Sequence, residues 1–206
     1  MPAATGAVFT QNKMCAAPVL VSRKVAAKSY AQAIVVNSGC ANACTGEQGL
    51  KDAEAMQAQT AELLGVENDA VYVCSTGVIG HFMPMDKLAK GIAGAVDAMD
   101  ETGGESCAMA IQTTDTFIKH AAYEFELGGK TVKIAGIAKG AGMIHPNMAT
   151  MLTFLTTDAA VAPDVLKRAV KVAADKSFNM VVVDGDTSTN DLSLIHISEP
   201  TRQAEI

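Results

Sequence analysis

Residues 139–152 read KGAGMIHPNMATML, so a glycine-rich turn is followed by an apolar run that begins beside Thr150. A threonine hydroxyl is a weak nucleophile at neutral pH unless a base lies beside it. A cut in the chain directly before a threonine supplies such a base, because a free α-amine titrates at about 7.7 to 8.0. Thr150 is therefore a candidate nucleophile. The alternatives are that Thr150 is an ordinary β-branched residue at the start of a strand, or that His145 is the base.

The segments on either side of this stretch predict strands. Alternating apolar and polar residues at 123–127 and 132–134 flank Gly128 and Gly129, which suit a two-residue hairpin turn. The returning strand leads directly into the stretch. After it, the apolar residues 151–155 predict a buried strand.

A helix is expected next, because proline is favoured in a first helical turn. It opens at Pro163 and places Leu166, Ala169, Val170 and Ala173 on its inward face. The same patterns predict further elements: strands at 33–37, 71–74 and 178–183, and helices at 45–64, 85–99 and 105–112. Strands and helices are mixed and a hairpin is present, so we expect an α+β fold with partly antiparallel sheet.

One helix start carries a specific signal. Thr45 and Gln48 have the spacing of a capping box, in which each side chain bonds a backbone N–H of the other residue. Gly65 is suited to end that helix.

Composition excludes several classes of protein. The chain has 206 residues, 49% of them hydrophobic, which is enough for a sizeable core. Its formal net charge is −6 and it has no basic run, so binding to nucleic acid has no electrostatic basis. The apolar stretches are too short to span a bilayer, and the first residues do not resemble a signal sequence. We expect a cytoplasmic protein.

The sequence gives little support for a metal or nucleotide site. Five cysteines without an export signal indicate reduced thiols, and Cys40 and Cys44 lack further ligands for zinc, so we expect them to be small buried groups. Asp184 and Asp186 are more typical of a turn than of a metal site. Glycines 136, 140 and 142 complete neither a phosphate loop nor a dinucleotide motif.

Five blocks together resemble one known family. They are NSGCANACTG (37–46), STGVIG (75–80), TTDTF (113–117), the stretch at 139–152 and VDGDTSTND (183–191). In this order they look like the bifunctional ornithine acetyltransferase (glutamate N-acetyltransferase) family of arginine biosynthesis. The resemblance covers residues 7–191. It implies that family's fold, an α+β arrangement of layered sheets sandwiched between helices, with a mechanism like that of N-terminal-nucleophile enzymes.

The resemblance also implies a reaction. The chain would cut itself between Ala149 and Thr150, and the freed Thr150 would carry acetyl from N-acetylornithine to glutamate as an ester. No metal or organic cofactor is implied, although acetyl-coenzyme A could serve as a co-substrate. The cut α and β chains would associate into a hetero-oligomer. A self-processing aminopeptidase of the same architecture and an uncut, non-catalytic fragment are the alternatives.

Four further residues match the family's site. Thr76 and Gly77 match the donors that stabilise the oxyanion, and Thr116 and Lys139 match substrate contacts. Taken alone, Ser-Thr-Gly is typical of a turn and a lysine is typical of solvated surface, so these roles come from the resemblance.

The resemblance stops at Asp191. Residues 192–202 (LSLIHISEPTR) look like a translated sequencing adapter and 203–206 like barcode, so we exclude 192–206 from the prediction of the fold. The alternative is a divergent natural C-terminus. On this interpretation residues 1–149 are the α-subunit region and 150–191 begin the β subunit. We then expect the chain to be an inactive fragment.

Overall fold

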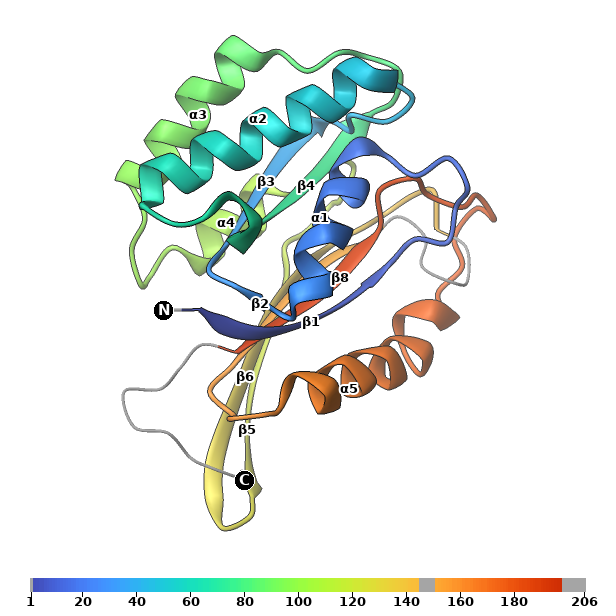
Figure 1. Cartoon of the computed structure of the whole chain (residues 1–206). Helices are drawn as coiled ribbons and strands as arrows, with labels where there is room; N and C mark the ends of the chain where they lie inside the picture. Colours follow the sequence, from blue (N-terminus) through green and yellow to red (C-terminus); the bar gives the residue numbers. More distant parts are fainter. Residues whose placement is uncertain (1, 145–150, 198–206) are drawn as a thin grey trace.

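The computed structural model describes residues 2–144 and 151–197, which form two β-sheets packed between helices (Figure 1). The larger sheet contains, in spatial order, β2 (Tyr30–Ala31), β1 (Ala3–Phe9), β8 (Leu192–Ile197), β7 (Leu152–Thr157), β6 (Lys130–Lys139) and β5 (Lys119–Leu127). The smaller sheet pairs β3 (Ala33–Cys40) in parallel with β4 (Val71–Val78). The helices are α1 (Ala17–Lys28), α2 (Gly46–Leu64), α3 (Met85–Asp97), α4 (Gly104–Ala110) and α5 (Pro163–Asp175), with 3-10 turns η1 (Asn68–Ala70) and η2 (Phe178–Met180).

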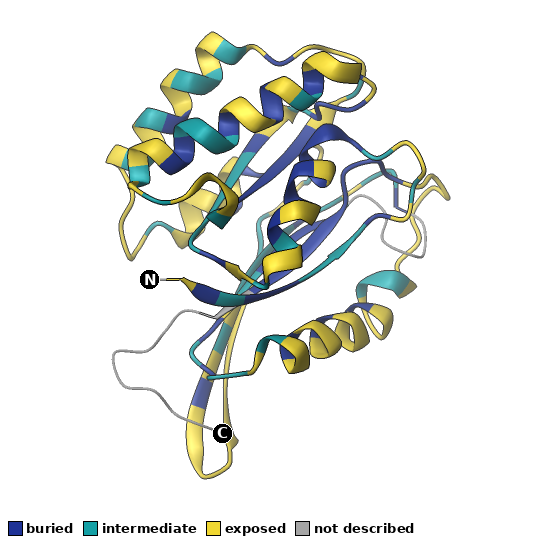
Figure 2. Ribbon diagram, in the orientation of Figure 1, coloured by how far each residue is buried: buried dark blue, intermediate teal, exposed yellow. Residues whose placement is uncertain are grey.

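The main core lies between the two sheets. Tyr72 and Cys74 of β4 pack there with Phe154 of β7 and Leu194 of β8. Successive side chains of a strand point to opposite faces, so Val73 lies on the other side of the small sheet, in a cluster with residues of α1 and α2. In Figure 2 the buried residues accordingly concentrate in β4 and in the strands of the large sheet that face it.

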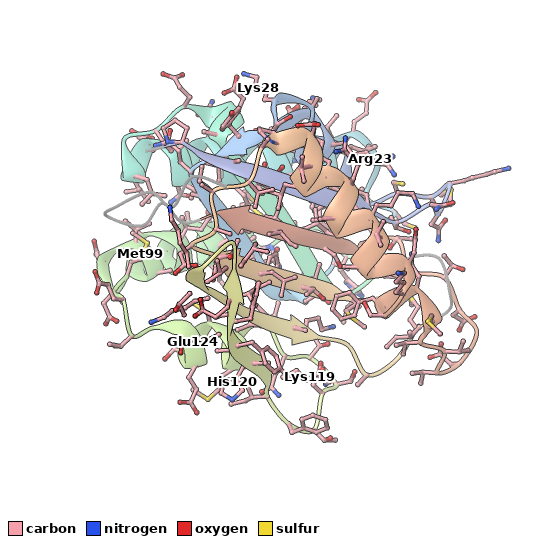
Figure 3. All side chains as sticks on the ribbon, turned by 90° about the horizontal axis from the view of Figure 1, so that it is seen from below. Arg23, Lys28, Met99, Lys119, His120 and Glu124 are labelled. Carbon is pink, nitrogen blue, oxygen red and sulfur yellow. The ribbon has the colours of Figure 1, made fainter. Side chains whose placement is uncertain are left out.

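The outer face of the large sheet is covered only in part. Leu166 and Val170 of α5 pack against Ile195 of β8. Figure 3 shows α5 crossing this face away from the β5–β6 hairpin, whose Lys119, His120 and Glu124 are labelled. The layers are therefore helix, small sheet, large sheet and helix, which confirms the predicted sandwich of sheets between helices.

Locally encoded elements match their predictions. The hairpin is β5 and β6, and both Gly128 and Gly129 have positive φ, 60° and 76°, as a two-residue turn requires. The strands expected at 33–37 and 71–74 are β3 and β4, and the strand after Thr150 is β7. The four predicted helices are α2, α3, α4 and α5.

Two predictions of side-chain position were wrong. Thr45 precedes α2 but caps no backbone N–H; its hydroxyl donates to Asn42 Oδ1 at 2.7 Å, because Asn42 lies buried beside it. Gln48 donates to Asp52 instead. On α5, Ala169 and Ala173 are exposed, since the helix meets the sheet along a narrow i, i+4, i+8 stripe of Leu166, Val170 and Ala174.

Residues 178–183 do not form the predicted strand. They form η2 followed by Val181, Val182 and Val183, which are exposed by 38%, 56% and 55%. The reason is that this run would need a free strand edge with which to pair. β7 is already paired on one side with β6 and on the other with β8, so the apolar run has no strand to join there.

β8 comes from the segment that was excluded from the prediction of the fold. Residues 192–197 pair antiparallel with β1 and parallel with β7, and Leu192 and Leu194 are buried in the main core. Ile195 packs on the opposite face against α5, so both faces of β8 are covered, as its largely apolar sequence suits. The origin of these residues as adapter sequence stays a prediction.

The cysteines are less buried than expected. Cys74 is buried in the core, but Cys40 is only half-buried and Cys44 is exposed at a positive φ of 57°. Cys40 is the last residue of β3, and Cys44 lies in the loop that follows, where the chain turns toward α2. The expectation that Cys40 and Cys44 are buried was therefore wrong.

Candidate active site

A cavity of about 620 Å³ opens where β3 and β4 end. It is lined by 38–39 of β3, 76–78 of β4, Lys139 at the end of β6, and the loops at 112–114 and 188–190. The carboxyl ends of parallel strands are a common place for a binding crevice, because connecting loops diverge there. Two sheets thus contribute strand ends to one cavity.

Lys139 and Thr76 meet in this cavity. Lys139 Nζ lies 3.0 Å from Thr76 Oγ1, and both residues are buried. An ammonium group can only donate, so Thr76 Oγ1 accepts this bond and its own hydroxyl proton can be directed elsewhere. Burial lowers the pKa of Lys139, while the carboxylates of Asp115 and Asp191 act in the opposite direction.

Gly77 follows Thr76 at a position that requires glycine. Its φ is +130°, and a Cβ there would lie 2.3 Å from the carbonyl carbon of Gly39 and 2.6 Å from the nitrogen of Cys40. β3 and β4 pair at this point, and the pairing becomes irregular at Cys40. The close approach of the two backbones leaves no room for a side chain at position 77.

Asp115 fixes the loop that precedes β5. Its carboxylate accepts hydrogen bonds from the Lys119 ammonium and, at 2.8 Å, from the Gly140 N–H. Burial acts to raise the pKa of Asp115, but these bonds and the nearby Lys139 outweigh it, so the pKa lies below its usual range. Asp115 therefore ties the 113–117 block to the end of β6.

Thr116, the other predicted substrate contact, is exposed and does not line the cavity. Its neighbours Thr113 and Thr114 do line it. The structure thus brings Thr76, Gly77 and Lys139 together and leaves Thr116 at the outside of the same loop.

Asp191 is a residue of this region to which the sequence analysis gave no role. It is buried, and Oδ1 accepts the Met151 N–H at 2.8 Å. Burial raises the pKa of Asp191 to about 7, although hydrogen bonds from Ser188 and Met151 and the charge of Lys139 act against the rise. The only sequence signal was its place at the end of the last resembling block.

Thr150, Ala149 and His145 lie outside the described residues, as does the predicted cut between Ala149 and Thr150. The described chain reaches Ile144 on one side, which is buried, and Met151 on the other.

Within residues 2–144 and 151–197, no group of three or more His, Cys, Asp or Glu side chains could hold a metal ion. Asp184 accepts the N–H of Asp186 at 3.3 Å, which is the turn-forming role predicted for this pair. In the same ranges, none of the helices combines the length and apolar character needed to cross a lipid bilayer.

Three known proteins resemble this chain closely. The arginine biosynthesis bifunctional protein ArgJ of Symbiobacterium thermophilum is 53% identical over 195 residues, which cover 95% of this chain and 48% of that protein. The crystal structure of ArgJ from Bacillus halodurans matches with a TM-score of 0.65 at 46% identity, over 72% of this chain and 78% of the solved one. Ornithine acetyltransferase from Mycobacterium tuberculosis, solved in complex with ornithine, gives a TM-score of 0.60 at 38% identity, over 71% and 77%.

These matches decide the family. The chain spans about half the length of the curated relatives that it matches. The two solved relatives share its α+β architecture. The model of the ArgJ family matches residues 1–204, which is nearly the whole chain. The chain therefore belongs to the ArgJ family.

Proposed function

We propose that the whole protein transfers an acetyl group from N-acetylornithine to glutamate in arginine biosynthesis, after cutting itself between Ala149 and Thr150. The observation that carries this proposal is the buried 3.0 Å hydrogen bond from Lys139 to Thr76 in the cavity at the strand ends. A buried cation beside a hydroxyl donor suits a substrate with a carboxylate and a carbonyl that becomes an oxyanion. The relative from Mycobacterium tuberculosis, an ornithine acetyltransferase solved with ornithine, supports the same substrate class.

Self-cleavage would create the working group. Thr150 Oγ attacks the carbonyl carbon of Ala149, and the hydroxyl proton passes to the Thr150 nitrogen as the C–N bond breaks. This leaves an ester between Ala149 and Thr150. Water then hydrolyses the ester, which gives a carboxylate on Ala149 and frees both the hydroxyl and the α-amine of Thr150.

Acetyl exchange would follow in two steps. The α-amine of Thr150 takes the hydroxyl proton as Oγ attacks the acetyl carbonyl of N-acetylornithine, and that proton leaves on the amine of ornithine. The acetyl ester on Thr150 is then attacked by the amine of glutamate, which restores the free hydroxyl. Such a double displacement gives ping-pong kinetics.

The remaining residues would serve these steps. The Thr76 hydroxyl and the Gly77 N–H stabilise the oxyanion of each tetrahedral intermediate. Lys139 contacts the substrate, with the ammonium placed for a carboxylate. The same role for Thr116, which lies outside the cavity, rests on the resemblance to the family alone. No cofactor is required, and acetyl-coenzyme A could enter as a second acetyl donor.

The 206-residue chain alone is proposed to be inactive. Residues 1–149 would be the α-subunit region and 150–191 the opening of the β subunit, so contacts from the second half would be missing. In the whole protein the two chains would associate into a hetero-oligomer in the cytoplasm.

An exchange assay tests this function. The full-length protein that contains residues 1–191 is incubated with N-acetylornithine and labelled glutamate, and with unblocked dipeptides in parallel. Labelled N-acetylglutamate, with one acetyl group trapped on the piece that begins at Thr150, is the expected result. Dipeptide hydrolysis without acetyl exchange would favour the aminopeptidase instead.

A further inference from the structure

One loop contacts the chain on both sides of residues 145–150. This loop, residues 183–191, is called here the bracketing loop. On the upstream side the Asp184 carboxylate accepts the Met143 N–H and, at 2.9 Å, the Ile144 N–H. The Val183 N–H also donates to the Ile144 carbonyl at 2.9 Å. Three hydrogen bonds therefore fix residues 143–144 to the start of the loop.

On the downstream side the other end of the loop makes a matching contact. Asp191 Oδ1 accepts the Met151 N–H at 2.8 Å, and the Leu192 N–H donates to the Met151 carbonyl at 3.3 Å. Met151 directly follows Thr150, and their shared peptide group is planar. These two bonds therefore fix the chain at Met151, the first described residue after the proposed cut.

The bracketing loop is itself fixed to the cavity wall. The Asn190 side-chain amide donates to the carbonyls of Ala41 and Ser75, the residue just before Thr76. Thr10 donates its hydroxyl to the Ser188 carbonyl and its N–H to the Asp191 carbonyl. The loop is thus held in register with the strand end that carries the oxyanion donors.

We propose that Asp184 and Asp191 are positioning residues for self-cleavage, which hold the two flanks of the scissile segment against the end of β4. This inference rests on the proposed function. Attack within one chain is fast only when the reacting atoms are held close and aligned. Asp184 and Asp191 accept N–H bonds on the two described flanks of the proposed cut, at residues 143–144 and at Met151.

The positioning role of Asp184 and Asp191 depends on their oxygen acceptors, and substitution can separate loss of the acceptor from loss of the charge. At Asp191 only Oδ1 accepts an N–H bond from Met151, so asparagine keeps that acceptor, whereas alanine keeps none. At Asp184 the Met143 N–H bonds Oδ2 and the Ile144 N–H bonds Oδ1, so asparagine keeps one of the two acceptors. Asp186 offers a matched control, because it lies in the same loop with an exposed side chain and bonds Asp184 only through its backbone N–H.

The test follows self-cleavage over time in the freshly synthesised full-length protein, by intact mass. Asp184→Ala and Asp191→Ala are expected to slow the cut at least about tenfold, the effect of losing a hydrogen bond to a charged group. Asp191→Asn should restore it to within about threefold, because its one acceptor is retained. Asp184→Asn should cut at a rate between those of wild type and Asp184→Ala, because one of two acceptors is retained. Asp186→Ala should cut at the wild-type rate. Thermal melting of each uncut chain, in a Thr150→Val background, checks that the variants fold.

The outcomes separate the positioning role from the proposed function. If the wild-type protein cuts itself and folded alanine variants cut equally fast, the positioning role is wrong and the proposed function stands. The positioning role is also wrong if asparagine is as slow as alanine at both positions, because acceptance of the N–H bond would not be what matters. If the wild-type protein is never cut, the proposed function fails and the inference fails with it.

Discussion

The ammonium of Lys139, the last residue of β6, donates a 3.0 Å hydrogen bond to the hydroxyl of Thr76 near the end of β4. The two residues belong to different sheets, so the bond exists only when the sheets are packed. Because Lys139 has no acceptor, the Thr76 hydroxyl proton is available to the cavity. The pair therefore joins a buried positive charge to a directed hydroxyl donor.

Thr76 can be tested by removing only its hydroxyl. Thr76→Val keeps the branched shape, removes the donor and leaves Lys139 without this partner. We expect kcat for acetyl exchange to fall by about 10²- to 10³-fold, the usual cost of one oxyanion donor. Thr76→Ser should keep kcat within about tenfold, since it retains the hydroxyl. Equal kcat values for valine and wild type would remove Thr76 from the mechanism.

Lys139 is expected to support both binding and chemistry. Lys139→Met keeps the length of the side chain and removes its charge, so we expect a higher KM for glutamate and a lower kcat. A charged hydrogen bond is worth about 1.5 to 3 kcal/mol, which is roughly 10- to 150-fold in kcat/KM. Lys133→Met, on the same strand, is the control because its exposed ion pair with Glu124 contributes little. A matching loss in both variants would speak against a special role for Lys139.

Gly77 is expected to tolerate no side chain. Gly77→Ala would press a Cβ into the backbone of Gly39 and Cys40. The free energy of unfolding should fall by roughly 2 kcal/mol or more, because a positive φ and overpacking both cost stability. Gly91→Ala is the comparison, since it meets no atoms within 4 Å and lies inside α3. That variant should be more stable than wild type by up to about 1 kcal/mol in urea denaturation. Equal stability of the two variants would contradict the contact at Gly77.

Asp191 predicts a pH dependence of stability. Burial raises its pKa from 3.8 to about 7, so between these values the folded protein holds a proton that the unfolded chain releases. The stabilising contribution is complete below pH 3.8 and is lost as the pH rises through about 7, a change on the order of 4 kcal/mol. Asp191→Asn does not lose this contribution as the pH rises, because asparagine does not titrate. We therefore expect the free energy of unfolding of the variant, measured in urea titrations, to rise relative to wild type from pH 5 to pH 8. Parallel curves of this free energy against pH would refute the raised pKa of Asp191.

Elements with local signals could be predicted from the sequence. Gly128 and Gly129 between alternating residues specify the hairpin, and Pro163 marks the start of α5. Elements that depend on distant partners could not be predicted. The apolar run at 178–183 resembles a strand, but β8 occupies the place beside β7, so the run cannot pair there.

The residues of the candidate site also divide into those that could be predicted from the sequence and those that could not. Thr76, Gly77 and Lys139 could be proposed from their resemblance to a family, and they do line one cavity. Asp191 could not be proposed, because its contact with Met151 spans 40 residues of sequence and no local pattern marks a buried carboxylate. The hydrogen bond that Asp191 accepts from the Met151 N–H is visible only in the folded chain.

The central claim is that the chain cuts itself before Thr150, and intact mass spectrometry of the full-length protein tests it most directly. For wild type we predict two pieces whose masses meet between Ala149 and Thr150, and for Thr150→Val a single uncut chain. A wild-type protein that exchanges acetyl groups at full rate as one uncut chain would contradict the account.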